Sequence, residues 1–141
     1  ARDGNVVGEG WHERYGEAHA EVNALRAAGD RARGATAYVT LEPCNHQGKR
    51  GPCTEALLAA GVRRVVVATP DPHAVAAGGA ARLRAAGVRV DVGLLGPRAR
   101  ELNAAFLRDE AGGALPWVTL KLALSLDGAV ADYTRGPGWL T

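Results

Sequence analysis

Residues 62–69 constrain the fold more than any other stretch, because they form an almost continuous run of β-branched residues ending in VVVAT. A strand that is apolar on both faces is typical of the centre of a parallel sheet. Shorter apolar runs at residues 35–41 and 88–94 lie on either side of it, separated by alanine-rich amphipathic segments. This alternation predicts an α/β domain.

Glycine and proline positions set the limits of the other expected elements. Helices are expected at residues 18–28, 52–60, 80–86 and 97–107, and further strands at residues 6–11 and 116–126. Polar loops are expected at residues 42–51 and 70–79.

The expected domain organisation follows from a break after the last helix. Residues 109–114 contain Gly112 and Gly113 and interrupt the alternation, so they predict a linker. Residues 1–108 would then form one domain, and residues 115–141 the opening of a second, with a turn at Asp127-Gly128.

The composition excludes several classes of protein. The 141 residues are 47% hydrophobic and 23% charged, which excludes a disordered chain. A formal net charge of +2 is too small to indicate binding to nucleic acid or a membrane surface. No apolar run reaches membrane-spanning length, and the first residues do not resemble a signal peptide, so a cytoplasmic protein is expected.

Four residues carry a recognisable chemistry: His19, Glu21, Cys44 and Cys53. One imidazole and the chain's two thiols supply three zinc ligands, and a fourth tetrahedral position left open is the catalytic arrangement. A nearby carboxylate can carry protons. His19 and Cys53 fall at expected helix starts and Cys44 follows an expected strand, so all should meet at the carboxyl end of the sheet.

The order H-x-E, then P-C and a further cysteine, is the pattern of zinc-dependent deaminases. A structural zinc site remains an alternative, because His46 could supply a fourth protein ligand. In that case the chain would be a non-catalytic module stabilised by zinc.

Two longer stretches carry a specific resemblance. The segment HAEVNAL and the segment AYVTLEPCNHQGKRGPCTEALLAAGVRRVVVA closely resemble the deaminase half of the bifunctional riboflavin-biosynthesis deaminase–reductase family. The similarity runs from VVGEGWH to LNAAFL and includes the long insert between the cysteines. The segment LKLALSLDGAVA resembles the opening strand of that family's reductase domain.

The resemblance implies a three-layer α/β/α sheet of the cytidine-deaminase type. It also implies hydrolytic deamination of 2,5-diamino-6-(5-phosphoribosylamino)pyrimidin-4(3H)-one to 5-amino-6-(5-phosphoribosylamino)uracil in riboflavin biosynthesis. In this implied site His19, Cys44 and Cys53 hold Zn²⁺ and Glu21 carries protons. NADPH belongs to the full-length reductase, and this fragment is not expected to use it.

Further residues match substrate-binding positions of the family: His12, Lys49, Arg50 and Asp71. His46 matches a loop histidine beside the ligands. The sequence departs from the family where Asp71-Pro72-His73 replaces the usual Asp-Pro-Asn. The family also usually has a helix and an Asn-Pro-x-Val-Gly strand before VVGEG, so the first domain is expected to lack them.

Other functions remain open at this point. The chain could deaminate another base, a nucleoside or RNA, although a basic insert at Lys49 and Arg50 favours a phosphorylated small molecule. The expected partners are that small molecule and no nucleic acid or membrane. Members of the family associate, so the resemblance allows for a homo-oligomer.

Overall fold

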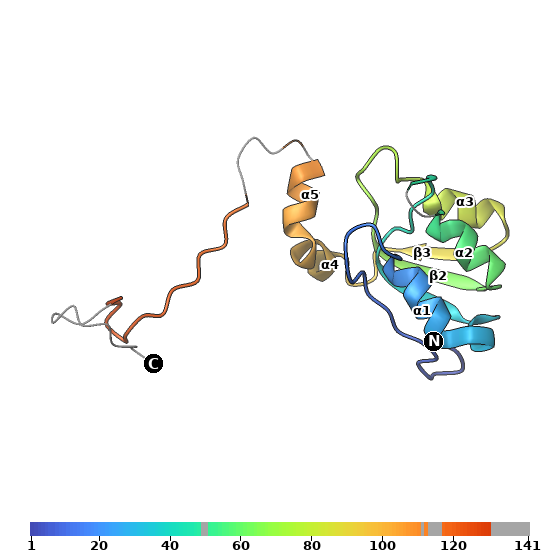
Figure 1. The fold of residues 1–141 in the computed structure, drawn as a ribbon, viewed down its shortest axis with the longest axis horizontal. Helices are drawn as coiled ribbons and strands as arrows, with labels where there is room; N and C mark the ends of the chain where they lie inside the picture. The colour runs from blue at the N-terminus through green and yellow to red at the C-terminus, as the bar shows by residue number, and fades with distance from the viewer. Residues whose placement is uncertain (49–50, 111, 113–116, 131–141) are drawn as a thin grey trace.

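A three-stranded parallel sheet forms the centre of the chain in this computed structural model, which describes residues 1–48, 51–110, 112 and 117–130. Its strands are β1 (Thr36–Leu41), β2 (Arg64–Thr69) and β3 (Arg89–Val92), hydrogen-bonded in the order β1-β2-β3 (Figure 1). The prediction of an α/β domain with a parallel sheet is confirmed.

The middle strand, β2, contains the run of three consecutive valines, Val65 to Val67. Val67 pairs with Val39 on one side and Val92 on the other. Val65 and Val67 have no exposed surface. The prediction that this run is a buried central strand is therefore confirmed.

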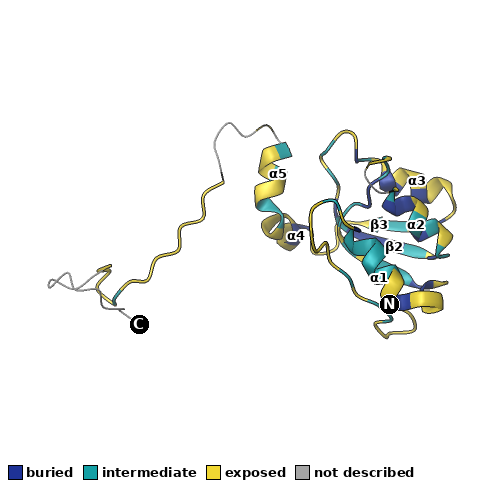
Figure 2. Cartoon of the chain, viewed as in Figure 1, coloured by how far each residue is buried: buried dark blue, intermediate teal, exposed yellow. Residues whose placement is uncertain are grey.

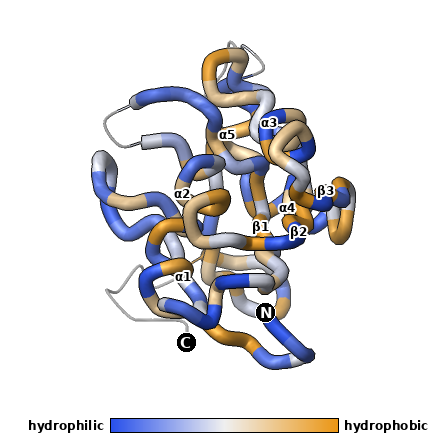
Figure 3. The backbone as a smooth tube through the Cα atoms, turned by 90° about the vertical axis from the view of Figure 1, so that its right-hand side faces the viewer, coloured by the Kyte–Doolittle hydropathy of each residue, from blue (hydrophilic) through white to orange (hydrophobic). Residues whose placement is uncertain are grey.

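One helix joins each pair of consecutive strands, and other described helices precede β1 and follow β3. The described helices are α1 (Ala20–Ala28), a 3₁₀ turn η1 (Gly29–Ala32), α2 (Cys53–Ala59), α3 (Gly79–Ala85), α4 (Gly96–Leu102) and α5 (Ala104–Glu110). Consecutive parallel strands joined by right-handed crossovers place α2 and α3 on the same face of the sheet. In Figure 3, α1 and α2 lie to the left of β1 and β2; α1 contacts α2, and α2 contacts α3.

The hydrophobic core lies between these helices and the sheet. Leu57 of α2 and Leu83 of α3 are almost fully buried against Val65 and Val67 of β2. Leu25 of α1 packs against the same cluster. Figure 2 shows that burial concentrates at this contact between helices and strands.

The opposite face of the sheet is more polar. Tyr38 of β1 is 58% exposed. Beside it on the same face, Arg64 of β2 donates to the carboxylate of Asp91 of β3 at 2.6 Å. The helix α4, which follows β3, contacts the middle strand β2.

The prediction of a strand at residues 6–11 is wrong. This segment has no regular secondary structure and lies along α1, where Gly8 and Gly10 approach the helix backbone at Ala24. A Cβ atom on either glycine would overlap that backbone. Its apolar residues resemble a strand, but a strand also needs a partner for its backbone hydrogen bonds, and none of the described strands pairs with it.

The C-terminal predictions were only partly right. The helix expected at residues 97–107 is interrupted at Asn103, whose side-chain amide and backbone N–H both donate to the Ala99 carbonyl, at 2.9 and 3.1 Å. The next helix, α5, runs to Glu110, so it enters the expected linker.

The strand expected at residues 116–126 is not formed over its described part. Residues 117–126 have no strand partner, and Leu120, Leu122 and Leu124 are exposed. The predicted turn is present, because the Gly128 N–H donates to the Ser125 carbonyl at 2.9 Å. The domain boundaries at 108 and 115 stay predictions. Within the described residues no helix is both long and apolar enough to cross a membrane.

Candidate metal centre

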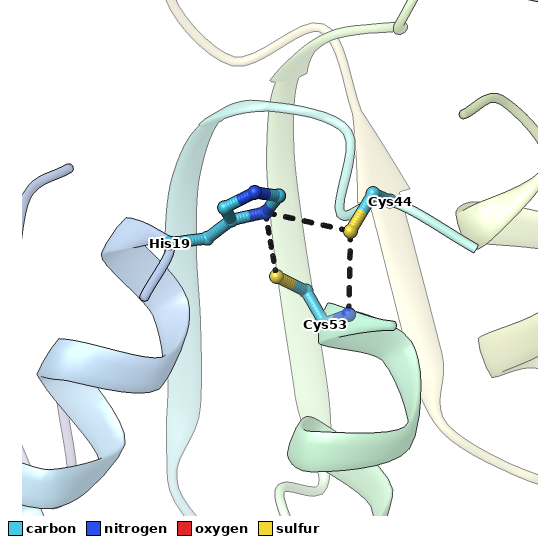
Figure 4. Close-up of side chains that lie close together, drawn as sticks. All are labelled: His19, Cys44 and Cys53. Carbon is cyan, nitrogen blue, oxygen red and sulfur yellow. Dashed lines mark hydrogen bonds between the residues drawn. The ribbon is translucent and has the colours of Figure 1, made fainter. Parts of the chain in front are cut away.

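His19, Cys44 and Cys53 converge at the carboxyl end of the sheet, with their potential ligand atoms all within 4.8 Å of one another. The His19 Nδ1 atom lies 3.5 Å from the Cys44 Sγ atom and 3.3 Å from the Cys53 Sγ atom. Figure 4 shows the ring and both sulfur atoms facing one another. The sequence prediction that these three residues meet agrees with this geometry.

Each of the three side chains is placed by the start of a helix or the end of a strand. His19 is the N-cap of α1, and Cys53 is the first residue of α2. Cys44 follows the end of β1 by three residues, and its Sγ atom accepts a hydrogen bond of 3.4 Å from the Cys53 N–H. The strand ends and helix starts of one sheet edge thus assemble the group.

The two sulfur atoms strongly affect each other's protonation. A hydrogen bond from Cys53 lowers the pKa of the Cys44 thiol to about 5, so Cys44 carries a thiolate near neutral pH. The same hydrogen bond, together with burial and the charge of Glu21, raises the pKa of Cys53 far above its usual value. Cys53 therefore keeps its proton at a pH at which Cys44 has lost its own.

This arrangement fits a zinc ion. Both cysteines are free and nearly buried, with Cys53 only 1% exposed. Two sulfurs and one imidazole nitrogen are ligands that zinc prefers, and a divalent cation between them would allow both cysteines to be thiolates. In the described part of the chain, His46 is not a member of the group, so no fourth protein ligand is seen there.

Glu21 lies beside the group, two residues after His19 on the first turn of α1. Its carboxylate accepts a hydrogen bond from the Cys53 thiol. Burial raises the pKa of Glu21 above its usual value of 4.5, while hydrogen bonds to its own backbone and to Cys53 act in the opposite direction. A carboxyl group with a raised pKa is suited to both accepting and donating a proton.

His12, predicted to contact the substrate, is also beside the metal group. Its ring packs edge-on against the His19 ring with 5.5 Å between centroids, and its Nδ1 atom lies 3.1 Å from the Ala18 carbonyl oxygen. Asn23 fixes this segment by donating to the carbonyl oxygens of Trp11 at 2.8 Å and Ala18 at 3.4 Å.

Asp71 is placed by a turn after β2. Its Oδ1 atom accepts a hydrogen bond of 2.9 Å from the His73 N–H, which is the bond of a turn residue. The following turn packs against the metal group, because Ala76 forms a small buried cluster with Cys44 and Cys53. Lys49 and Arg50, the other two residues predicted to bind substrate, lie outside the described residues.

Sequence reasoning missed three residues that hold the Cys44 loop. Asn45 bonds through its N–H to the Ala76 carbonyl at 3.0 Å, and its side chain accepts a hydrogen bond of 3.1 Å from the buried Thr54 hydroxyl. Glu42 accepts hydrogen bonds from two backbone N–H groups of other segments. All three are neighbours of the cysteines in sequence. Asn45 and Thr54 bond to each other across the two cysteine segments, whereas the backbone partners of Asn45 and Glu42 lie much further along the chain.

A separate hollow of about 420 Å³ lies at the amino end of β1, lined by residues that include Arg2, Tyr38 and Arg63. None of the predicted site residues lines it. The converging donor atoms, rather than this hollow, therefore mark the candidate site.

Comparisons with known proteins agree with this geometry. Residues 1–69 match the family model described as the cytidine and deoxycytidylate deaminase zinc-binding region. Riboflavin biosynthesis protein RibD of Escherichia coli (strain K12) is 52% identical over 99% of this chain and 38% of its own length. The diaminohydroxyphosphoribosylamino-pyrimidine deaminase of Buchnera aphidicola subsp. Schizaphis graminum is 46% identical over 73% of this chain and 71% of its own length.

Solved structures of RibD and of a related deaminase–reductase resemble this chain in fold and in sequence. Acinetobacter baumannii RibD, form 1, has a TM-score of 0.80 and 49% identity, covering 99% of this chain and 39% of that one. A Thermotoga maritima protein titled as a diaminohydroxyphosphoribosylaminopyrimidine deaminase and 5-amino-6-(5-phosphoribosylamino)uracil reductase has a TM-score of 0.84 and 36% identity, covering 99% and 41%. The chain thus spans about two fifths of the length of these longer proteins.

Proposed function

Since this chain belongs to the family of the riboflavin-biosynthesis pyrimidine deaminases, we propose that it catalyses the zinc-dependent hydrolytic deamination of 2,5-diamino-6-(5-phosphoribosylamino)pyrimidin-4(3H)-one. The product would be 5-amino-6-(5-phosphoribosylamino)uracil. Water adds to ring carbon 2, which bears the 2-amino group. The bond between this carbon and the amino nitrogen then breaks, and ammonia leaves.

One observation carries this proposal: a nitrogen and two sulfur donors meet within 4.8 Å, with a carboxylate in contact with one of the sulfurs. His19, Cys44 and Cys53 would hold zinc. When bound, zinc supplies a Lewis acid that makes a water molecule acidic enough to lose a proton near neutral pH.

Glu21 is the proposed proton carrier, because it lies beside the three donor residues and its pKa is raised. Its carboxylate would take one proton from water and deliver it to a ring nitrogen, and would then carry the second proton, from the added hydroxyl group, to the departing amine. The raised pKa of the Glu21 carboxyl makes its carboxylate a better base for the first half of this transfer, and the protonated carboxyl is then the acid for the second half.

The substrate roles are argued from position. His12 reaches the metal group from a neighbouring segment, and Asp71 belongs to a loop that packs against Cys44, so both could contact the pyrimidine. Lys49 and Arg50 would bind the phosphate, since a cationic side chain in the insert suits a phosphorylated substrate.

The wider setting is also proposed. Residues 115–141 would open a reductase domain, and NADPH would serve that domain in the longer protein. A cytoplasmic location and a homo-oligomer are in keeping with the family resemblance. No nucleic acid or membrane partner is proposed.

The direct test is to incubate the purified, zinc-loaded chain with the diaminopyrimidine ribotide and to measure ammonia release. The same assay is run with the unphosphorylated nucleoside and with cytidine. We expect turnover of the ribotide and at least a tenfold preference for it over the nucleoside, on the order of one lost charge-assisted phosphate contact. Equal or better turnover of the nucleoside would contradict the role given to Lys49.

A further inference from the structure

Glu42 joins three segments that carry the site. It follows β1 directly and is half-buried, and its own N–H donates to the Thr69 carbonyl at the end of β2 at 2.9 Å. Its Oε1 atom accepts a hydrogen bond of 2.7 Å from the Ala80 N–H, at the start of α3. Its Oε2 atom accepts one of 3.2 Å from the Asp71 N–H. Both carboxylate oxygens are therefore used, each by a different segment.

Cys44 is only two residues from this carboxylate, and the chain between them has little freedom. The intervening Pro43 is fully buried, and its carbonyl oxygen packs against Gly79. On the other side of Cys44, the Asn45 N–H is bonded to the Ala76 carbonyl at 3.0 Å. A shift of Glu42 relative to α3 would consequently move the Cys44 sulfur.

We propose that Glu42 is a positioning residue that fixes the metal ligand Cys44 and the loop of Asp71 in one arrangement. The part concerning Asp71 rests on the proposed function, whereas the part concerning Cys44 requires only that the three donors bind a metal. Glu42 touches neither the metal group nor the reacting atoms, so its effect passes through the two loops that it joins.

The carboxylate is required for a chemical reason. The two backbone N–H groups come from different segments and approach different oxygens of the carboxylate, so both oxygens must be acceptors in this arrangement. Glutamine offers one oxygen and one NH₂ group, so one of the two N–H groups would face another donor. Aspartate keeps both oxygens but is shorter by one methylene group, so it cannot reach Ala80 and Asp71 together.

The test compares Glu42→Gln and Glu42→Asp with wild type and with Glu55→Gln. Glu55 is the matched control, because it also links two elements through its carboxylate, to Arg82 at 2.8 Å, but not the Cys44 loop. Zinc affinity is measured by competition with a chromophoric chelator, and the site geometry by the absorption spectrum of the cobalt-substituted protein. For Glu42→Gln we expect an affinity about tenfold lower or more, an altered cobalt spectrum and a raised KM for the ribotide.

A merely structural role predicts a different result. It would lower the melting temperature equally with and without zinc, while zinc affinity and the cobalt spectrum would stay at wild-type values; that result would overturn the proposal. If Glu42→Gln does not fold, Glu42→Asp is judged by the same measurements. Should wild type fail to deaminate the ribotide, the proposed function fails, but zinc affinity and the cobalt spectrum still decide the role of Glu42 toward Cys44.

Discussion

The carbonyl oxygen of Pro43 packs so closely against Gly79 that a Cβ atom on residue 79 would overlap it. Pro43 precedes Cys44, and Gly79 begins α3, so this contact sets how near the helix comes to the metal-ligand loop. Glycine is needed here because a larger side chain has no space. It is not needed for its conformational freedom, since the backbone of Gly79 is not left-handed.

Gly79→Ala should therefore push the Cys44 loop away from α3. We expect destabilisation of about 1–3 kcal/mol from overpacking, together with weaker zinc binding. Thermal unfolding and chelator competition measure the two effects. Gly51→Ala is the matched control, since among the described residues nothing apart from its chain neighbours lies within 4 Å of a Cβ at that position. If Gly79→Ala kept the wild-type zinc affinity, the contact between Pro43 and Gly79 would not be what positions the Cys44 loop.

Removal of zinc should lower the stability of the folded chain. A ligand that binds only the folded state at about 100 times its Kd stabilises it by about 2.7 kcal/mol. We expect a chelator to lower the melting temperature of wild type and to have little effect on His19→Ala, which lacks one of the three donors. An unchanged melting temperature of wild type in chelator would argue against a bound metal.

Asn23→Ala should disturb the segment that carries His12. The substitution removes hydrogen bonds to the carbonyl oxygens of Trp11 and Ala18, each contributing about 1 kcal/mol. We expect a raised KM for the ribotide with a smaller change in kcat, because the ligands and Glu21 keep their own contacts. Asn103→Ala, which removes a comparable bond to Ala99 in α4, serves as the control. An unchanged KM would count against a substrate role for His12.

The sheet could be predicted from sequence because its signals are local. The β-branched run at β2 and the glycines that follow α1 and α2 determine their elements through backbone preference alone. The prediction for residues 6–11 was wrong for the opposite reason. Their apolar pattern resembles a strand, but their structure depends on packing against α1 at Ala24, which is distant in sequence. The break at Asn103 could not be predicted, because the bond from its side-chain amide to the Ala99 carbonyl has no signal in the apolar pattern of the sequence.

The candidate metal group could also be predicted, since its residue types and their places at strand and helix ends are visible in the sequence. What holds the group could not. The role of Glu42 depends on Asp71 and Ala80, which lie 29 and 38 residues away, and the spacing says nothing about such a contact. Thr54 is likewise an ordinary helix residue until Asn45 is found beside it.

Asp91 should make stability depend on pH at the acid end. A hydrogen bond from Arg64 lowers the pKa of the Asp91 carboxyl below its ordinary value of 3.8, and Arg89 acts in the same direction. The folded state thus favours the ionised form, so the stabilisation is present above about pH 4 and is lost as the pH falls through the folded-state pKa.

Asp91→Asn is accordingly expected to lower the melting temperature slightly at neutral pH, with the difference from wild type shrinking below about pH 4. Thermal unfolding across this range measures it, and Asp30→Asn, an exposed acid outside the sheet, is the control. A difference that stays constant down to the lowest pH would show that the ion pair with Arg64 is not its source.

Glu21→Gln separates metal binding from proton transfer. Glutamine keeps the size of the side chain, and the three donor residues are unchanged, so zinc content should stay near wild type by elemental analysis. Ammonia release should fall by about 10²–10⁴-fold, the usual contribution of a positioned acid–base group. Glu17→Gln, at an exposed glutamate of the preceding segment, should keep full activity. If Glu21→Gln instead loses its zinc, the carboxylate acts mainly by holding Cys53, and another group must carry the proton.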